Sequence, residues 1–317
     1  MKIVLLDKAT LGGVDLSIFE EFGEFITYDI TKPEDTLERV ADADIVLSNK
    51  VVIDKNIMDN VPNLKLVCVT ATGMNNIDLE YAKQKGIVVK NAVGYSTSSV
   101  AQTTFTILFS LIGRVCFYDE YVKSFEWSNS PVFTNLSKEF MEIKGKQWGI
   151  IGLGNIGKEV AKIASAFGAN IVYYSTSGKN SNKMYTRVEL EDLLKESDIV
   201  SIHAPLNRYT KNLITKKELE MLKKGAYILN LGRGGIINEK DLAEAIDSLD
   251  IYAGLDVVET EPIPRENPLL HVKQRERLVM TPHIAWASKE AREELIKITY
   301  KNIKDFIGEN NGKRTQF

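Results

Sequence analysis

The stretch Trp148–Gly157, WGIIGLGNIG, decides the fold because it places three glycines between an apolar run and a helix-forming segment. Its first four residues are typical of a buried strand, and Lys158–Phe167 has the pattern of the helix that follows. At these positions, Gly152 gives a tight turn and Gly154 lets a pyrophosphate approach the backbone. Gly157 allows the helix to pack closely on the strand. The sequence therefore predicts a dinucleotide-binding turn.

The helix that opens at Asn155 and Ile156 presents free N–H groups and a partial positive charge to the phosphates of NAD or NADP. A tight turn without a ligand is the alternative. An NAD site usually carries a carboxylate about 20 residues further on, where it binds the ribose 2′-hydroxyl. This position is occupied by Ser175, and Thr176–Lys179 adds hydroxyls and a lysine. We therefore expect tolerance of a 2′-phosphate; the alternative is that Ser175 binds the 2′-hydroxyl of NAD.

Composition limits the class of protein. The 317 residues suggest about two domains, and 44% hydrophobic with 26% charged residues is typical of a globular chain with a core. A net charge of −3 gives no basic excess, so we expect neither a nucleic-acid nor a membrane partner. Cys68 and Cys116 lie in apolar runs and are expected to be free thiols in a reducing cytoplasm. No apolar run reaches the ~20 residues that span a bilayer.

Short β-rich runs alternate with longer amphipathic runs in two series. The first series predicts strands at Lys2–Asp7, Phe25–Asp29, Asp44–Ser48, Leu64–Thr70 and Ile87–Asn91. The second predicts strands at Gln147–Gly152, Asn170–Ser175, Asp198–His203, Ala226–Leu231, Ile251–Val257 and Leu278–Met280. This alternation predicts an α/β protein with two doubly wound parallel sheets. Thr97–Lys123 is predicted as a long helical segment between the series, and Ser288–Phe306 as a final helix.

Ligands of parallel α/β sheets bind beyond the carboxyl ends of the strands. His203 and His283 follow predicted strands and are candidates for catalysis, with a structural histidine as the alternative for each; His271 lies in a charged loop. Arg233 lies among glycines after a strand, where a guanidinium can bind a planar carboxylate through two parallel hydrogen bonds. A solvated arginine in a turn is the alternative.

A carboxylate beside a histidine raises the pKa of the imidazole and fixes its tautomer, which suits a general acid that protonates a carbonyl oxygen. Glu261 is a candidate for this position, although the sequence does not show whether it contacts His283. No metal site is expected, because HExxH and CxxC motifs and histidine pairs at helical spacing are absent.

Together these motifs resemble the D-isomer-specific 2-hydroxyacid dehydrogenases. The resemblance rests on the ordered set Gly152–Gly157, His203–Leu206 with Thr210, Asn230–Gly235, Gly254–Pro262 and Thr281–Ile284. It implies a Rossmann-type cofactor domain, residues 99–287, inserted into a flavodoxin-like substrate domain, residues 1–98 and 288–317. It further implies that the domains close over the substrate and that Thr97–Lys123 supplies a homodimer contact.

The resemblance also implies roles for single residues. Arg233 would hold the substrate carboxylate and polarise its carbonyl. His283 would be the acid in reduction and the base in oxidation, and Glu261 would keep His283 protonated. Asp256 would bind the nicotinamide carboxamide. Further cofactor contacts would come from His203, Ala204, Pro205, Thr210, Leu231 and Gly232.

Ala71–Asp78 resembles the substrate loop of this family, in which backbone N–H groups at Thr72, Gly73 and Met74 would bind the carboxylate. Trp286 would lie beside the mouth of the site, or pack between the domains. Three segments resemble the glycerate dehydrogenase (hydroxypyruvate reductase) branch of this family: Gly94–Thr97, Gln102 and His283–Ser288. We therefore expect a D-2-hydroxyacid dehydrogenase acting on hydroxypyruvate or glyoxylate. The alternative substrates are pyruvate, as in a D-lactate dehydrogenase, and bulkier 2-oxo acids. The alternative to an enzyme is a nucleotide-binding protein similar to a corepressor.

Overall fold

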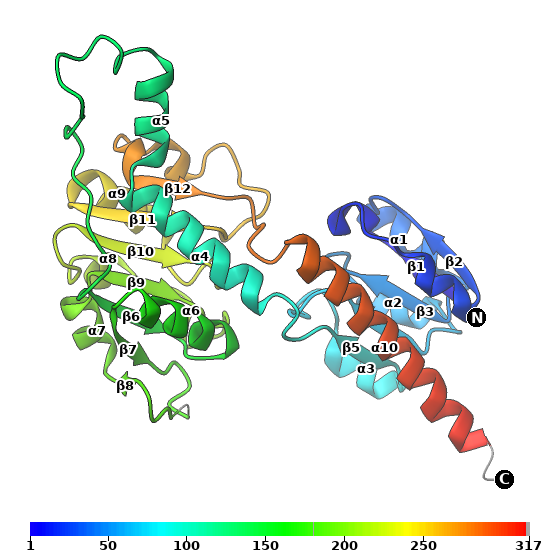
Figure 1. Ribbon diagram of the computed structural model, residues 1–317. Coiled ribbons are helices and arrows are strands. Elements are labelled where there is room, and N and C mark those ends of the chain that lie inside the picture. Colours follow the sequence, from blue (N-terminus) through cyan, green and yellow to red (C-terminus); the bar gives the residue numbers. More distant parts are fainter. Residues whose placement is uncertain (180, 315–317) are drawn as a thin grey trace. The chain divides into compact units, whose positions relative to one another are not determined.

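The computed structural model describes residues 1–179 and 181–314, which separate into two compact units (Figure 1). Thr97–Trp286 is called the central unit, and Met1–Ser96 together with the chain from Ala287 onward is called the terminal unit. Each unit is built on one parallel sheet. The predicted class, α/β with two doubly wound parallel sheets, is confirmed; the functional assignment of the two units stays a prediction.

The terminal unit contains a five-stranded sheet in the order β2-β1-β3-β4-β5, which is the flavodoxin-like order. Its strands are β1 (Lys2–Leu5), β2 (Glu24–Thr27), β3 (Ile45–Ser48), β4 (Leu66–Val69) and β5 (Val88–Asn91). The strand order reverses between β1 and β3, and sheets of this kind bind their ligands at the carboxyl edge beside such a reversal.

Helices α1 (Thr36–Val40), α2 (Lys55–Asn60) and α3 (Leu79–Lys85) pack on alternate residues of this sheet in one hydrophobic cluster. The last helix, α10 (Lys289–Arg314), packs against β4 and β5 (Figure 1). The terminal unit is therefore built from two segments that lie far apart in the sequence. Asp54 caps α2, because its side chain accepts a hydrogen bond from the Ile57 N–H at 3.0 Å. Short 3-10 helices cover Lys8–Leu11, Ser17–Phe22 and Pro33–Asp35.

The central unit contains a seven-stranded sheet in the order β12-β11-β10-β9-β6-β7-β8. Its strands are β6 (Gln147–Ile151), β7 (Asn170–Tyr174), β8 (Thr186–Arg187), β9 (Ile199–Ile202), β10 (Ala226–Asn230), β11 (Ile251–Leu255) and β12 (Leu278–Met280). This is the Rossmann order with one added edge strand, and it reverses between β6 and β9, where such sheets bind their ligand. The two-residue strand β8 was not predicted, because it is exposed and has no apolar pattern.

Two helix layers cover this sheet. Helices α4 (Thr97–Ile112) and α6 (Asn155–Ala166) lie side by side on one face, over Trp148 and Ile150 (Figure 1). Helices α7 (Leu190–Glu196), α8 (Lys216–Leu219) and α9 (Glu239–Ser248) cover the other face. The buried indole of Trp148 donates to the Ser201 hydroxyl at 2.9 Å, so its polar atom is satisfied inside the core. Short 3-10 helices cover Pro268–His271 and Arg275–Arg277.

The predicted helical segment Thr97–Lys123 is not continuous, which corrects the sequence prediction. It breaks after α4, and α5 (Val115–Lys123) continues at an angle of 56°. The break lies at Gly113 and Arg114, and Arg114 adopts a left-handed conformation with φ of 51°. The Arg114 guanidinium lies 4.4 Å from the centre of the Tyr252 ring, and this contact compensates for the unfavourable backbone.

Within the described ranges, none of the helices is by itself long and apolar enough to cross a membrane. Helices α4 and α5 meet the criteria of length and composition only as a bent pair.

Candidate active site

The glycine turn after β6 has the geometry that a dinucleotide requires. Gly152 has φ of 94°, and a Cβ there would lie 3.0 Å from the Ala204 backbone. At Gly157 a Cβ would lie 2.3 Å from the Gly152 carbonyl oxygen, so only glycine lets α6 approach β6 this closely. Gly154 faces open space, and a Cβ there would meet no atom within 4 Å. The space in front of Gly154 is where phosphates approach such turns.

No side chain caps the start of α6, because its N-cap residue is Gly154. The first N–H groups of a helix have no acceptor within the helix, so those at Asn155 and Ile156 are available to phosphate oxygens. The turn therefore fits the pyrophosphate of NAD or NADP, which would supply the hydride chemistry.

An arginine that the sequence analysis missed, Arg187, contacts the loop after β7 from strand β8. Ser175 is buried, and its carbonyl accepts the Gly178 N–H at 3.1 Å, which closes a turn. Arg187 pairs with Tyr173 through β8, and its Nη1 donates to the Gly178 carbonyl at 2.9 Å. The guanidinium therefore lies beside the expected adenosine ribose site. Only the unpredicted strand β8 places it there, so no sequence signal pointed to it.

His203 follows β9 and is not a proton donor at neutral pH. Both ring nitrogens are buried, and neither has a hydrogen-bond partner in the described part of the chain. Burial lowers the pKa of the imidazole to about 3, so the ring stays neutral. The catalytic alternative for this residue is therefore not supported, and a cofactor contact stays a prediction.

The residues after His203 form a rigid turn beside the glycine turn. The buried Thr210 hydroxyl donates to the Pro205 carbonyl at 2.6 Å and accepts the Asn207 N–H at 2.8 Å. Ala204 is buried, and its carbonyl would lie 2.9 Å from a Cβ at Gly232, so the turns after β9 and β10 touch. Thr210 thus holds the shape of this turn, and its predicted cofactor contact is not tested.

Arg233 lies in a turn that Asn230 fixes from both sides. The buried Asn230 amide accepts the Gly232 N–H at 3.1 Å and donates to the Arg233 carbonyl at 2.8 Å. The half-buried guanidinium donates to the Gly232 carbonyl at 2.9 Å and forms no ion pair with a carboxylate of the described residues. Leu231, just before it, is buried. An unpaired, half-buried guanidinium is suited to bind an external carboxylate.

The turn after β10 also touches the turn after β11. A Cβ at Gly234 would lie 2.0 Å from the carbonyl carbon of Val258 and 2.5 Å from the Glu259 nitrogen. Glycine at this position therefore lets the Arg233 turn lie directly against the turn that leads to Glu261.

Glu261 and His283 are in contact. The His283 Nδ1 lies 2.7 Å from the Glu261 Oε2, and the other carboxylate oxygen accepts the Val258 N–H at 3.2 Å. The carboxylate fixes the tautomer of the ring and leaves the Nε2 for proton transfer. His283 itself has φ of 53°, a left-handed conformation that is unusual for a histidine and that neighbouring contacts must hold.

Asp256 supplies those contacts. Its carboxylate is 2% exposed, and it accepts the Thr281 hydroxyl at 2.6 Å and the N–H groups of Ile284 and Ala285 at 2.9 Å each. Its carbonyl accepts the His283 N–H at 2.8 Å. Burial raises the pKa of the Asp256 carboxyl, and the hydrogen bonds oppose this effect. Asp256 therefore positions His283; its predicted contact with the carboxamide is not tested.

The remaining candidates lie elsewhere on the two units. Trp286 packs against the core beneath α4 and α6. In the terminal unit, the Thr72 hydroxyl donates to the Ala92 carbonyl at 2.9 Å. Among the described residues, no protein acceptor binds the N–H of Gly73 or Met74, so both are available to an anion.

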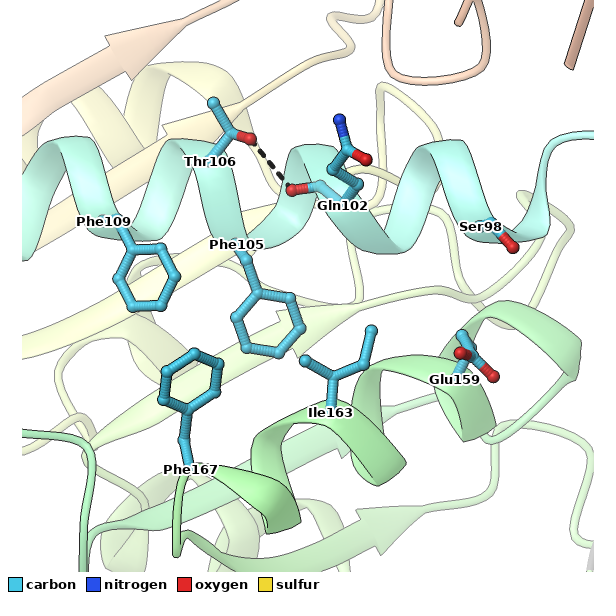
Figure 2. Close-up of a pocket in the computed structure, with 8 residues that line it drawn as sticks. All are labelled: Ser98, Gln102, Phe105, Thr106, Phe109, Glu159, Ile163 and Phe167. Carbon is cyan, nitrogen blue, oxygen red and sulfur yellow. Dashed lines mark hydrogen bonds between the residues drawn. The ribbon is translucent and has the colours of Figure 1, made fainter. Parts of the chain in front are cut away.

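An apolar hollow on the central unit is separate from these residues. It measures about 430 Å³ and lies between α4 and α6 (Figure 2). Its lining residues are Ser98, Gln102, Phe105, Thr106, Phe109, Glu159, Ile163 and Phe167. A second hollow of about 440 Å³ shares Phe109 and Phe167 with it. Over the described ranges, no three His, Cys, Asp or Glu side chains are grouped to hold a metal.

Comparison with known proteins gives the class. A family model for the NAD binding domain of D-isomer specific 2-hydroxyacid dehydrogenases matches residues 105–285. A hydroxypyruvate reductase of Blautia hydrogenotrophica is 39% identical over 97% of both chains. A glycerate dehydrogenase of Methylorubrum extorquens is 33% identical over 96% of both. The structure of an acyclic imino acid reductase with NADPH and D-Arg matches with a TM-score of 0.86 at 29% identity, over 98% of both chains.

The chain therefore belongs to the D-isomer-specific 2-hydroxyacid dehydrogenase family and is an oxidoreductase that uses a nicotinamide dinucleotide. Its relatives place it in the glycerate dehydrogenase branch, so the predicted family and branch are confirmed. The same relatives favour an enzyme over the corepressor-like alternative.

Two substitutions in the glycine turn should have different effects, one on stability and the other on cofactor binding. Gly157→Ala should destabilise the central unit by about 2 kcal/mol, because its Cβ overlaps the Gly152 carbonyl. Gly154→Ala should leave stability unchanged and weaken NADH binding about tenfold or more, because the methyl group occupies the approach of the phosphates. Urea unfolding and titration of NADH fluorescence measure the two effects. Normal NADH affinity in Gly154→Ala would contradict the assignment of the turn.

The buried, neutral His203 makes stability depend on pH. Unfolded chains protonate this histidine below about pH 6.5, whereas the folded chain does not, so the free energy of unfolding falls as the pH falls. Between pH 7 and pH 5 the loss should be about 2 kcal/mol, and His203→Asn should abolish it. All three tryptophans lie in the central unit, so their fluorescence reports its urea unfolding. His271→Asn, at the exposed end of the 3-10 helix Pro268–His271, is the control and should retain the loss.

Proposed function

We propose that this enzyme reduces hydroxypyruvate or glyoxylate to the corresponding 2-hydroxy acid, D-glycerate in the first case, with NADH or NADPH. The central unit binds the cofactor and the terminal unit offers the substrate loop. The observation that carries this proposal is the pair Glu261 and His283, held beside the turn of the unpaired Arg233. Its relatives in the glycerate dehydrogenase branch support the same substrates.

Arg233 binds the substrate carboxylate and polarises its 2-oxo group. Its guanidinium is permanently charged and offers parallel N–H donors to a planar anion. Since no protein carboxylate is paired with it in the described residues, its charge is not neutralised before the substrate binds. The positive charge also stabilises the negative charge that develops on the carbonyl oxygen during reduction.

His283 protonates that oxygen through its Nε2 and removes the proton in the reverse reaction. Glu261 on the Nδ1 keeps the ring in one orientation, with the Nε2 directed away from the carboxylate. The bound nicotinamide supplies or accepts the hydride at the substrate carbon. N–H groups at Gly73 and Met74 bind the anionic end of the substrate, and Thr72, bonded to Ala92, holds their loop.

A substrate panel tests the function. Oxidation of NADH or NADPH at 340 nm is followed with hydroxypyruvate, glyoxylate, pyruvate and a bulkier 2-oxo acid.

His283→Ala should lower kcat by about 10²–10⁴-fold and leave NADH affinity unchanged, because only proton transfer is lost. Arg233→Ala should raise KM and lower kcat together, and Arg233→Lys should restore part of the loss. Activity of His283→Ala equal to wild type would refute the acid role.

The loop after β7 also accepts the 2′-phosphate of NADPH. The residues Ser175–Lys179 include no carboxylate that would repel a phosphate, and Lys179 and Arg187 add two positive charges. The structural relative that contains NADPH supports this cofactor. Ser175 provides the alternative contact with the 2′-hydroxyl of NADH.

Arg187→Ala tests this assignment. It should weaken NADPH binding about tenfold or more, because a charge-assisted contact with the phosphate is lost, and leave NADH binding unchanged. Fluorescence titration with each reduced cofactor measures the affinities directly. Lys183→Ala, which removes a lysine from the same segment, is the matched control. An equal effect of Arg187→Ala on both cofactors would show that the guanidinium does not bind the phosphate.

The enzyme is a cytoplasmic homodimer. Apolar side chains project from the segment after α5, between 48% and 88% exposed: Phe125, Trp127, Val132, Phe133, Leu136 and Phe140. The two apolar hollows at Phe109 and Phe167 belong to the same central unit, and Figure 2 shows the first of them. A two-fold dimer needs projecting and hollow surfaces on one molecule, and this unit has both. Sedimentation equilibrium measures the mass directly.

A further inference from the structure

Asp7 is a buried carboxylate that the proposed mechanism does not use. It follows β1 at the carboxyl edge of the terminal sheet and is 4% exposed. Its oxygens accept three consecutive backbone N–H groups from the turn after β3: Asn49 at 2.9 and 3.0 Å, Lys50 at 2.6 Å and Val51 at 3.3 Å. No cation of the described residues pairs with Asp7, so these N–H groups alone compensate its buried charge.

The turn that Asp7 holds is bonded to the proposed substrate loop. The Asn76 amide donates to the Val51 carbonyl at 2.9 Å, and the Ser48 hydroxyl donates to the same carbonyl at 2.9 Å. The Ile53 N–H donates to the Asn76 carbonyl at 2.9 Å, and the Asp78 N–H donates back to the Ile53 carbonyl at 3.1 Å. The turn after β3 and the loop Ala71–Asp78 therefore form one hydrogen-bonded assembly.

Asp7 can act on substrate binding only through this assembly. It bonds no residue of the loop Ala71–Asp78 among the described residues, and the N–H groups of the turn after β3 are already occupied by its carboxylate. The open N–H groups at Gly73 and Met74 lie in the loop itself. Their direction depends on how Asn76 and its neighbours are held.

We propose that Asp7 is a positioning residue that sets the direction of the substrate-binding N–H groups at Gly73 and Met74, by way of the turn after β3 and Asn76. This inference rests on the proposed function of the loop. The amide of Asp7→Asn keeps one acceptor oxygen and places an NH2 group, which cannot accept, where the second oxygen was. The three N–H groups of the turn then share too few acceptors, so the turn, and with it the loop, loses its fixed orientation.

Asp7→Asn tests the inference because it preserves size and removes the charge. Asp44→Asn is the matched control: Asp44 lies at the opposite edge of the same sheet and accepts the Lys2 N–H at 3.0 Å. Asp7→Asn should raise KM for the 2-oxo acid about tenfold or more, with a smaller change in kcat and an unchanged Kd for NADH. Asp44→Asn should leave all three at wild-type values.

Amide hydrogen exchange gives a second readout that does not depend on turnover. Asp7→Asn should accelerate exchange at Ile53 and Asp78, whose N–H groups join the turn to the loop, and Asp44→Asn should not. Wild-type exchange at these amides in Asp7→Asn would overturn the inference, as would an equal rise in KM in both variants. A wild-type enzyme that reduces no 2-oxo acid would refute the proposed function, and the exchange result would still decide the link between Asp7 and the loop.

Asn76→Ala provides an independent variant in case Asp7→Asn does not fold. It removes the side-chain bond between turn and loop and leaves Asp7 in place. It should raise KM in the same direction, and in the double variant the two effects should not add, since both act along one chain of contacts. Fully additive effects on KM would contradict the proposed route.

Discussion

The buried carboxylate of Asp256 fixes the loop that contains His283, and the rest of the candidate site depends on it. Its hydrogen bonds to Thr281, Ile284 and Ala285 hold a loop in which His283 has an unfavourable backbone conformation. A carboxylate buried on this scale is costly unless N–H and O–H donors surround it. These donors come from the same loop that contains His283. The hydrogen bonds that offset the cost of burying the Asp256 carboxylate are therefore the ones that fix the position of His283.

The terminal unit uses the same device in a different sheet. Asp7, like Asp256, follows a strand, is almost fully buried and accepts N–H groups from a neighbouring loop. Asn230 fixes the turn of Arg233 in a similar way, but through the hydrogen bonds of a neutral amide. Arg233 and His283, the groups proposed to react, stay half-exposed, and the polar groups that orient them are buried. Rigidity therefore comes from residues to which the proposed mechanism gives no proton transfer and no contact with the substrate.

The two sheets and the glycine turn could be predicted because their signals are local: apolar runs, helical periodicity and glycines at fixed spacing. The sequence could only suggest the contact of Glu261 with His283. The two residues are 22 positions apart in the chain, and their contact depends on how the fold places the turns after β10 and β11. Arg187, Asp7 and Asn230 were missed because their partners depend on strand pairing or on loop geometry. The break at Gly113 and Arg114 was missed because the apolar pattern continues across it. His203 and His283 look alike in sequence, and burial, which only the fold shows, distinguishes the neutral ring of His203 from the proposed acid–base group, His283.

The packing of α10 on β4 and β5 sets an order of events during synthesis on the ribosome. All five strands of the terminal sheet emerge before Thr97, yet the helix that covers two of them starts only at Lys289. The central unit, by contrast, is complete once Trp286 has emerged. The nascent chain therefore finishes its central unit first, and the earliest strands have an uncovered apolar face until the last helix is made. Chaperones that recognise exposed apolar surface would meet this protein at its N-terminal half.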